Sequence, residues 1–478
     1  MIKKRLITSL CMVLLSAVFS VARADGFDAA FSAYEKRDYT SAMAGFKPLA
    51  KAGDVVAQNM MSLMYANGQG VNVDIAQAVF WQTQAANQGD VGAQVALAFR
   101  YFEGNGVPKD YQKALELNIA AAKQGNAAAQ FNLGVMYGQG IGVEKNTEQA
   151  LYWYSQTAEQ GDAAVQFNLA KMYQTGQNAP QSDAKALYWY NKAAMSGHAG
   201  AQNKLGLMFK SGLGVKADLA KAVHWFNQAA AQAEPDAQHN LGQLFHLGLG
   251  VSKDLKKAFY WYDEAAKQGH LGAQNSVAWM HEHGLGVVKN AQTAFAWYEQ
   301  AAKLGDAQAQ YNLGVLYATG KGIKSDAVQA AHWFNLAAQQ QHVRAQYELA
   351  AAYLRGLGVA PDLSKAVDWF RTAAKAGYPQ AQDQLGVRYA LGEGVEQSWV
   401  KAYHWFNLSA AQGFKPAQAH REQAEQKMTL KQVEQAQALS RQHDSQTNQN
   451  NNATDLGERD LPSITGRDAL TDVLGNPI

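Results

Sequence analysis

A sequence of 36 residues recurs along this chain of 478 residues without insertion or deletion. Copies begin at residues 57, 93, 129, 165, 201, 237, 273, 309, 345 and 381. A fixed period of this size is typical of solenoids, in which each repeat is a small unit that cannot bury its apolar face alone. We therefore expect one continuous array over residues 57–416 instead of several globular domains.

Each copy is predicted to form two helices separated by a turn, which reads Gly-x-Gly in nine copies and Gly176-Gln177-Asn178 in the copy that begins at 165. The first glycine of the turn is present in every copy, which favours a left-handed residue at the end of the first helix. Four residues after the last position of the turn comes a column of Asp, Asn and Ser, which are the residues that cap helix N-termini. The column is Asp74, Asp110, Asn146, Ser182, Asp218, Asp254, Asn290, Asp326, Asp362 and Ser398.

The second helix of a copy combines small and large apolar residues. In the copy that starts at 237, these are Ala258, Trp261 and Tyr262, a set that favours interlocking with neighbouring helices. A glycine closes most copies, but Ala233 and Gln341 replace it in two of them. If those two residues adopt the same left-handed conformation, each costs about 1 kcal/mol.

The repeated pattern Ala-Gln-x-x-Leu-Gly-x-x-Tyr-x-x-Gly-x-Gly-Val-x-x-Asp-x-x-x-Ala-x-x-Trp-Tyr-x-x-Ala-Ala-x-x-Gly resembles the Sel1-like repeat family, a relative of the tetratricopeptide repeats. The resemblance covers residues 57–416. It implies an all-α fold, a right-handed superhelical α/α solenoid of about eleven helix–turn–helix repeats, with the first helices lining the concave face. It also implies an adaptor that binds a protein or peptide partner.

The N-terminal residues 1–24 have the pattern of a secretory signal peptide. Lys3, Lys4 and Arg5 precede an apolar run from Leu6 to Val21, and Ala22-Arg23-Ala24 follows it. We expect cleavage after Ala24 and a periplasmic location, with secretion or surface association as alternatives. The apolar run is shorter than the roughly 20 residues of a membrane-spanning helix, so we expect no span in the mature chain.

Composition excludes several kinds of chemistry for the mature chain. Residues 1–24 hold four basic and no acidic side chains, so their removal leaves 38 Lys and Arg against 40 Asp and Glu. This balance gives no basic face for nucleic acid. The single cysteine, Cys11, lies within the predicted signal, which rules out thiol chemistry after cleavage. We expect a monomer without cofactors.

The regions that flank the array are predicted from their composition. Residues 25–56 resemble a shorter, degenerate first repeat, as expected where one face of a solenoid meets water. Residues 417–442 are predicted to form C-terminal capping helices. Residues 443–478 are rich in Ser, Gln, Asn, Thr and Asp, so we expect a disordered polar tail.

Enzyme signatures in the repeats are few. Ser182 and Lys185 match the Ser-x-x-Lys motif of serine β-lactamases, but the Ser-Asp-Asn and Lys-Thr-Gly motifs that accompany it are absent. Ser182 also belongs to the capping column. We therefore predict a non-enzymatic protein, with an envelope hydrolase of the β-lactamase kind as an alternative.

Histidines gather in two adjacent repeats. His239, His246 and His283, beside Glu282, could in principle ligate Zn²⁺ or Ni²⁺, but their spacing matches no known metal motif. We predict no metal site. A metal-binding or glycan-binding module remains a further alternative.

Tetratricopeptide relatives bind ligands along one stripe of their first helices, and the resemblance projects that stripe onto this chain. The projected residues are Phe99, Phe102, Phe131, Val135, Phe167, Gln243, Trp279, Glu282, Tyr311, Val315, Tyr347 and Arg355. We expect aromatic anchors, Trp279 among them, and polar side chains such as Gln243 and Arg355 to select the partner. The alternative for Trp279 is that it covers the neighbouring helix. The identity of the partner is not predicted.

Overall fold

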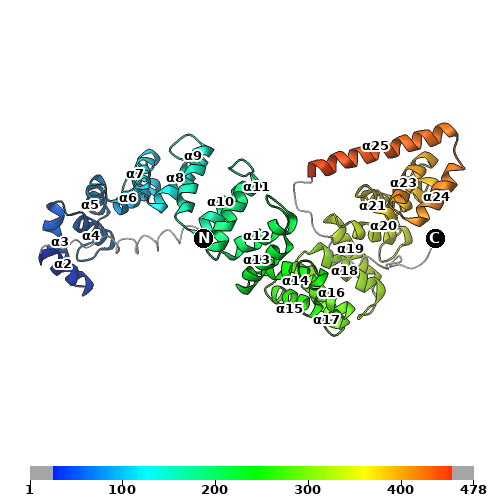
Figure 1. The fold of residues 1–478 in the computed structure, drawn as a ribbon, viewed down its shortest axis with the longest axis horizontal. Helices are drawn as coiled ribbons and strands as arrows, with labels where there is room; N and C mark the ends of the chain where they lie inside the picture. The colour runs from blue at the N-terminus through cyan, green and yellow to red at the C-terminus, as the bar shows by residue number, and fades with distance from the viewer. Residues whose placement is uncertain (1–24, 455–478) are drawn as a thin grey trace. The chain divides into compact units, whose positions relative to one another are not determined.

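The computed structural model describes residues 25–454, so the expected signal peptide and its cleavage site lie outside the described residues, as do residues 455–478. The described residues form 24 α-helices, labelled α2 to α25, and no strand (Figure 1). The predicted all-helical solenoid of repeated helix pairs is confirmed. No described helix is long and apolar enough to cross a membrane.

Each repeat contributes two helices. The first helices are α4 (Val55–Asn67), α6 (Val91–Glu103), α8 (Ala127–Gln139), α10 (Ala163–Thr175), α12 (Ala199–Ser211), α14 (Pro235–Leu247), α16 (Leu271–His283), α18 (Ala307–Thr319), α20 (Val343–Arg355) and α22 (Pro379–Leu391). The second helices are α5 (Ile75–Asn87), α7 (Tyr111–Lys123), α9 (Thr147–Glu159), α11 (Asp183–Met195), α13 (Leu219–Ala231), α15 (Leu255–Lys267), α17 (Ala291–Lys303), α19 (Ala327–Gln339), α21 (Leu363–Lys375) and α23 (Trp399–Ala411).

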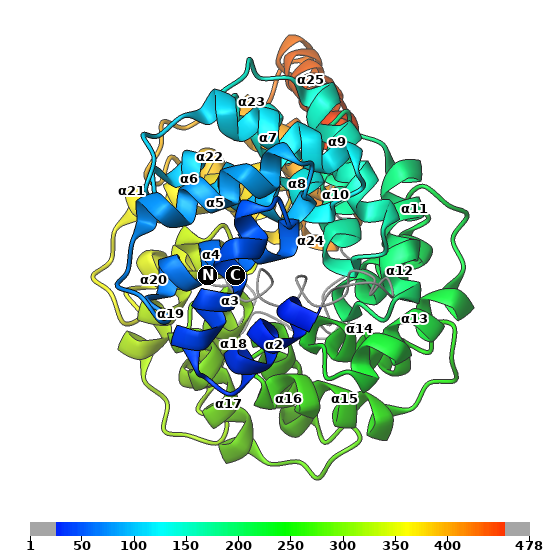
Figure 2. The same cartoon turned by 90° about the vertical axis from the view of Figure 1, so that its left-hand side faces the viewer.

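The helices divide into two compact units. The first holds the chain up to Met208 together with Gly212–Ala217, and the second holds Phe209–Ser211 together with the chain from Asp218. Within each unit a first helix packs against the second helix of its own repeat and against that of the preceding repeat. In the second unit, α14, α16 and α18 lie on the inner side of the curve and α15, α17 and α19 on the outer side (Figure 2).

The helix ends follow the predicted caps. The Asp74 carboxylate accepts a hydrogen bond from the backbone N–H of Gln77 at 2.9 Å, and the rest of its column caps in the same way. Ala233 and Gln341 have φ of 60° and 65°, so both are left-handed, as hypothesised for residues that replace the closing glycine.

The core is built from rings on the second helices that pack against small residues of the first. The Tyr262 ring is fully buried, and a Cβ atom on Gly242 would lie 2.6 Å from its Cδ1 atom. Glycine at that position therefore lets the two helices of the repeat come close together.

Helix pairs flank the array at both ends. The pair α2 (Asp25–Glu35) and α3 (Tyr39–Lys51) precedes it, and α24 (Lys415–Glu425) and α25 (Leu430–Thr454) follow it. The helix α25 packs on α23, where His404 Nδ1 lies 3.1 Å from Ser440 Oγ.

The structure corrects the predicted start of the tail. Residues 443–454 are helical and belong to α25, whereas the sequence analysis placed them in a disordered segment. Extending an established helix costs far less than starting one, so a packed first half of α25 can continue into a polar stretch that contains no Gly or Pro.

Candidate functional site

The third, seventh and tenth positions of each copy share one face of the first helix, because they are four and three residues apart. We call the side chains at these positions the first-helix stripe. The residues projected from the sequence belong to it, except Arg355, which follows the tenth position of its copy and is exposed.

In the first unit the first-helix stripe exposes aromatic rings. Phe99 is 40% exposed and Phe131 is 37% exposed. The Phe131 ring lies 5.8 Å from that of Tyr154 on α9. Phe102 is partly buried, with its ring 5.2 Å from that of Tyr111. These rings lie at the surface of the helices that carry them, as expected for anchors that contact a partner.

Phe167 lies deeper in the same unit. Its ring stacks on the His198 imidazole, with centroids 4.5 Å apart and planes inclined by 14°, and it approaches Tyr190 at 5.6 Å. Phe167 therefore connects two consecutive repeats and leaves only part of its surface to solvent.

Trp279 in the second unit is also partly buried. Its ring lies 5.4 Å from His246 on the preceding first helix and 4.6 Å from His283 on its own helix. This packing corresponds to the alternative that Trp279 covers the neighbouring helix. Gln243, at the equivalent position one repeat earlier, is partly buried as well.

Tyr311 and Tyr347, which the resemblance projected onto the ligand-binding stripe, are buried in the core. They are 4% and 9% exposed. The Tyr311 ring stacks on His342 at 4.7 Å, and the Tyr347 ring meets Tyr378 at 5.4 Å. In both cases the residue that starts the next first helix covers the ring, and burial raises the pKa of Tyr311.

Glu282 has partners in its own repeat and in the next one. The hydroxyl of Tyr298 donates a hydrogen bond to Glu282 Oε2 at 3.1 Å, and Lys321 Nζ lies 4.0 Å from Oε1. Burial is the main cause that raises the pKa of Tyr298, and the negative charge of Glu282 raises it further. Glu282 thus has an internal partner and is less available for selecting an external one.

The three candidate metal ligands face different neighbours. His239 stacks on His270 at 4.5 Å, and burial lowers its pKa to about 3. Burial also lowers the pKa of His246. His283 Nδ1 lies 2.9 Å from the carbonyl oxygen of Trp279. Over the described part of the chain, no three His, Cys, Asp or Glu side chains are placed to hold a metal ion.

Ser182 lies at the N-terminus of α11, where its hydroxyl accepts a hydrogen bond from the backbone N–H of Lys185 at 3.4 Å. The hydroxyl therefore serves as the helix cap that its column predicts, and the Ser-x-x-Lys match has a structural explanation.

Two structural columns were missed by the sequence analysis. One is a column of side chains that cap the N-termini of the first helices. These residues recur every 36 residues, and that recurrence could have revealed them in the sequence. These are Asp54, Asp90, Asn126, Asp162, His198, Glu234, His270, Asp306 and His342. The second missed column is the glutamine of the Ala-Gln pair, which is buried in each of the ten copies.

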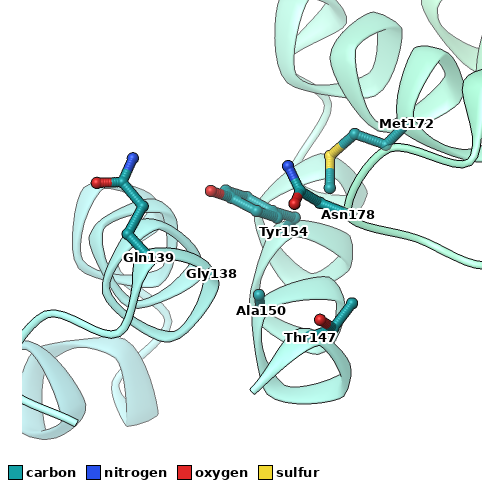
Figure 3. A pocket seen from close by; sticks show the side chains of 7 residues that line it. All are labelled: Gly138, Gln139, Thr147, Ala150, Tyr154, Met172 and Asn178. Carbon is teal, nitrogen blue, oxygen red and sulfur yellow. The ribbon is translucent and has the colours of Figure 1, made fainter. Parts of the chain in front are cut away.

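A pocket of about 110 Å³ opens in the first unit, between α8, α9 and the end of α10. Its lining residues are Gly138, Gln139, Thr147, Ala150, Tyr154, Met172 and Asn178 (Figure 3). Gly138 occupies the tenth position of its copy, so the pocket belongs to the first-helix stripe, and Tyr154 joins it to the exposed ring of Phe131.

Comparison with known proteins identifies the repeats. The family model described as Sel1 repeat matches residues 55–90, 91–126, 127–162, 163–198, 199–234, 235–270, 272–306, 307–342, 343–378 and 379–414. No curated protein matches the chain.

Among solved structures, a protective antigen present in uropathogenic Escherichia coli strains is 34% identical. The match covers 95% of this chain and 96% of the antigen, with a TM-score of 0.74. A Sel1 repeat protein from Oxalobacter formigenes is 35% identical over 52% of this chain and 100% of its own, with a TM-score of 0.47.

Proposed function

Because this chain belongs to the Sel1 repeat family, whose members typically mediate protein–protein interactions, we propose that it is a non-enzymatic scaffold that binds a segment of a partner protein on its first-helix stripe. The observation that carries this proposal is the exposure of Phe99 and Phe131 in the first unit. The array keeps many of its large rings buried, so two exposed phenylalanines on the stripe are available for binding.

The stripe of the first unit suits a partner segment that offers apolar side chains. Aromatic anchors dominate the energetics of many interfaces, and truncating one costs about 2 kcal/mol or more, roughly thirtyfold in affinity. In the second unit, Tyr311 and Tyr347 are buried and Glu282 is paired internally, so we place the main contacts on the first unit.

We also propose that the mature protein acts outside the cytoplasm. The sequence supports this through the basic, apolar and Ala-x-Ala series of residues 1–24. The similar E. coli protein is a protective antigen present in uropathogenic strains, which supports the same proposal for this chain. N-terminal sequencing of protein from the periplasmic fraction tests the proposal, and we expect Asp25 as the first residue. Retention of residues 1–24 would contradict it.

The binding proposal is tested by comparing exposed aromatic residues on the two helices of the repeats. Phe99→Ala and Phe131→Ala remove rings from the first-helix stripe. Tyr188→Ala is the matched control, because Tyr188 is 51% exposed on a second helix. We expect partner capture from envelope extracts to fall at least tenfold for the first two variants and to be unchanged for the third, with the helical circular dichroism preserved. Full capture by both Phe variants would place the interface elsewhere.

A further inference from the structure

The pocket beside Tyr154 lies where other copies of the repeat place a side chain. Tyr190 donates a hydrogen bond from its hydroxyl to Gln174 Oε1 at 2.8 Å, and Tyr298 donates one to Glu282 Oε2 at 3.1 Å. In both repeats the acceptor is the tenth residue of the copy. In the copy that begins at 129 the tenth residue is Gly138, which has no side chain to accept the Tyr154 hydroxyl.

A second departure from the repeat pattern lies at the same pocket. The second glycine of the Gly-x-Gly turn lies against the start of the preceding second helix, and a Cβ atom on Gly142 would be 2.6 Å from the carbonyl oxygen of Tyr111. The equivalent residue of the next repeat is Asn178, with a φ of 57°. Asn178 and Thr147, the first residue of α9, both line the pocket, and Figure 3 shows the Asn178 side chain beside Tyr154.

The effect of these two changes is visible on α9. Tyr190 and Tyr298 are fully buried, whereas Tyr154, at the equivalent position, is only partly buried. Figure 3 shows the Tyr154 side chain extending between Asn178 and Met172 on one side and the helix of Gly138 and Gln139 on the other. The ring and its hydroxyl therefore form a wall of the pocket.

The lining selects an uncharged ligand. No charged side chain lines the pocket, and its polar groups are the amides of Gln139 and Asn178 and the hydroxyls of Thr147 and Tyr154. Burial raises the pKa of Tyr154, so its hydroxyl stays protonated and able to donate. A carboxylate would have to leave water without a nearby cation, which is costly, whereas a carboxamide offers an acceptor without charge.

We propose that this pocket binds the side-chain carboxamide of a glutamine from the partner protein, which takes the place that Gln174 occupies in the next repeat. The carboxamide oxygen accepts the hydrogen bond of Tyr154, its NH₂ group donates to the amide oxygens of the lining, and its methylenes contact Ala150 and Met172. The inference rests on the proposed function, since it names one side chain that the first-helix stripe recognises next to Phe131.

The test uses the full-length mature protein and a small probe, N-acetyl-L-glutamine N-methylamide. Met172 lines the pocket, so its ¹³C-labelled methyl group, assigned with Met172→Leu, reports occupancy by NMR. We expect the probe to shift this resonance in a saturable way, and N-acetyl-L-alanine N-methylamide to leave it in place. The glutamate analogue should bind at least fivefold more weakly at pH 7.

Three variants locate the binding. Gly138→Gln fills the pocket from within, and a Cβ atom there would meet only Ala150 Cβ at an ordinary 3.6 Å, so we expect at least a tenfold loss of probe affinity. Tyr154→Phe removes one hydrogen bond and should weaken binding about three- to tenfold. Tyr152→Phe, on the same helix but 52% exposed, is the matched control and should change nothing.

A Met172 methyl resonance that does not shift at a 50-fold excess of the glutamine analogue over the protein would overturn the proposal. Equal binding of the glutamine analogue to the folded Gly138→Gln variant would overturn it as well. Equal binding of the glutamate and glutamine analogues would overturn its selectivity for a carboxamide. Because the probe requires no partner, these results are independent of the Phe99 and Phe131 variants, which test the proposed function itself.

Discussion

A buried glutamine ties each repeat to its neighbours. Gln238 Nε2 donates to the carbonyl oxygen of Ala230 at 3.4 Å, and its Oε1 accepts from Gln268 Nε2 at 2.7 Å. The same Gln–Gln hydrogen bond joins Gln58 to Gln88, Gln94 to Gln124, Gln130 to Gln160, Gln310 to Gln340 and Gln382 to Gln412. The second glutamine of each pair follows the end of the second helix of the same copy, so the pair joins the two helices of one repeat, while the bond to Ala230 reaches the preceding repeat.

Three copies lack the second glutamine, because Ser196, Leu304 and Ala376 stand at its position after the second helix. In the same three repeats, the Oε1 atom of the first glutamine is buried without a hydrogen-bond partner among the described residues. These glutamines are Gln166, Gln274 and Gln346. An unsatisfied buried acceptor destabilises a fold, so each of these three copies offers a site for improvement.

We predict that Leu304→Gln stabilises the second unit by about 0.5–1.5 kcal/mol, because the new amide can donate to Gln274 Oε1. Leu304 is 62% exposed, so little apolar packing is lost. The midpoint of urea unfolding measures the change, with Leu304→Met as a control that has similar size and no donor. Equal midpoints for the two variants would show that the added amide does not complete the pair.

His342 makes a pH-dependent contribution. Its Nδ1 accepts a hydrogen bond from the backbone N–H of Ala345 at 3.2 Å, which requires an unprotonated ring atom. Burial, assisted by the positive charge of Arg344, lowers the pKa of His342 to about 4, below the value of about 6.5 in unfolded chains. The unfolded state therefore binds the proton more readily, and the stabilisation present above pH 6.5 is lost as the pH falls towards 4.

We expect His342→Asn to flatten this dependence, because asparagine caps a helix without titrating in this range. Chemical unfolding at pH 7 and at pH 4.5 gives the comparison. The loss of unfolding free energy between the two pH values should be about 1–2 kcal/mol smaller in the variant, as a shift of one pKa unit corresponds to about 1.4 kcal/mol. Parallel pH profiles for the two proteins would contradict the assigned role.

Individual helices were predictable because their signals are local. The caps, the Gly-x-Gly turns and the apolar spacing all act within one copy, and the structure has helices where these signals place them. Burial of the stripe residues was not predictable in the same way. Tyr311 is buried because its ring stacks on His342, the N-cap residue of the next first helix, α20. Phe131, at the same position of its own copy, is exposed. That difference depends on the neighbouring repeat and not on the helix that carries the residue.

The turn between the two helices of a repeat also locks neighbouring repeats together. We predict that Gly142→Ala costs more than Gly125→Ala. Both glycines have a positive φ, but a Cβ atom on Gly125 would meet nothing within 4 Å, whereas one on Gly142 would press on the backbone of Tyr111.

We expect Gly125→Ala to lower the free energy of unfolding by about 1 kcal/mol, because alanine is strained in a left-handed conformation. Gly142→Ala should lower it by at least about 1 kcal/mol more, because of the added contact with Tyr111. Thermal unfolding followed by circular dichroism at 222 nm gives the order of the two variants. If Gly125→Ala were the more destabilised variant, the close approach at Gly142 would not limit the packing of the turn.

Across the whole molecule, the sequence sufficed for the architecture because 36-residue periodicity repeats the same packing problem ten times. It could not specify the candidate site. The pocket arises where two copies depart from their neighbours, at Gly138 and Asn178, and its lining combines residues of α8, α9, α10 and the turn that follows α10. Such departures are visible in the sequence, but their consequence requires the packed structure.

Removal of a whole repeat should leave a folded, shorter second unit. Deletion of residues 273–308 joins equivalent surfaces of the neighbouring repeats, so we expect the helical signal per residue and a cooperative melt to persist. Deletion of residues 273–290 removes half a repeat. It places a first-helix surface where a second-helix surface should pack, so we expect this variant to lose the cooperative melt. A similar, cooperative melt for both deletions would argue against repeat-by-repeat packing.

Photo-crosslinking in living cells tests whether a partner protein binds the first-helix stripe. For this purpose p-benzoylphenylalanine is placed at one position at a time. Phe99 and Phe131 probe the first-helix stripe, and Tyr188 and Tyr260 probe exposed positions on second helices, where they are 51% and 54% exposed. If the partner binds the first-helix stripe, we expect the same crosslinked protein from positions 99 and 131 and none from positions 188 and 260. Crosslinks confined to Tyr188 and Tyr260 would contradict it, because the partner would then bind the opposite helices.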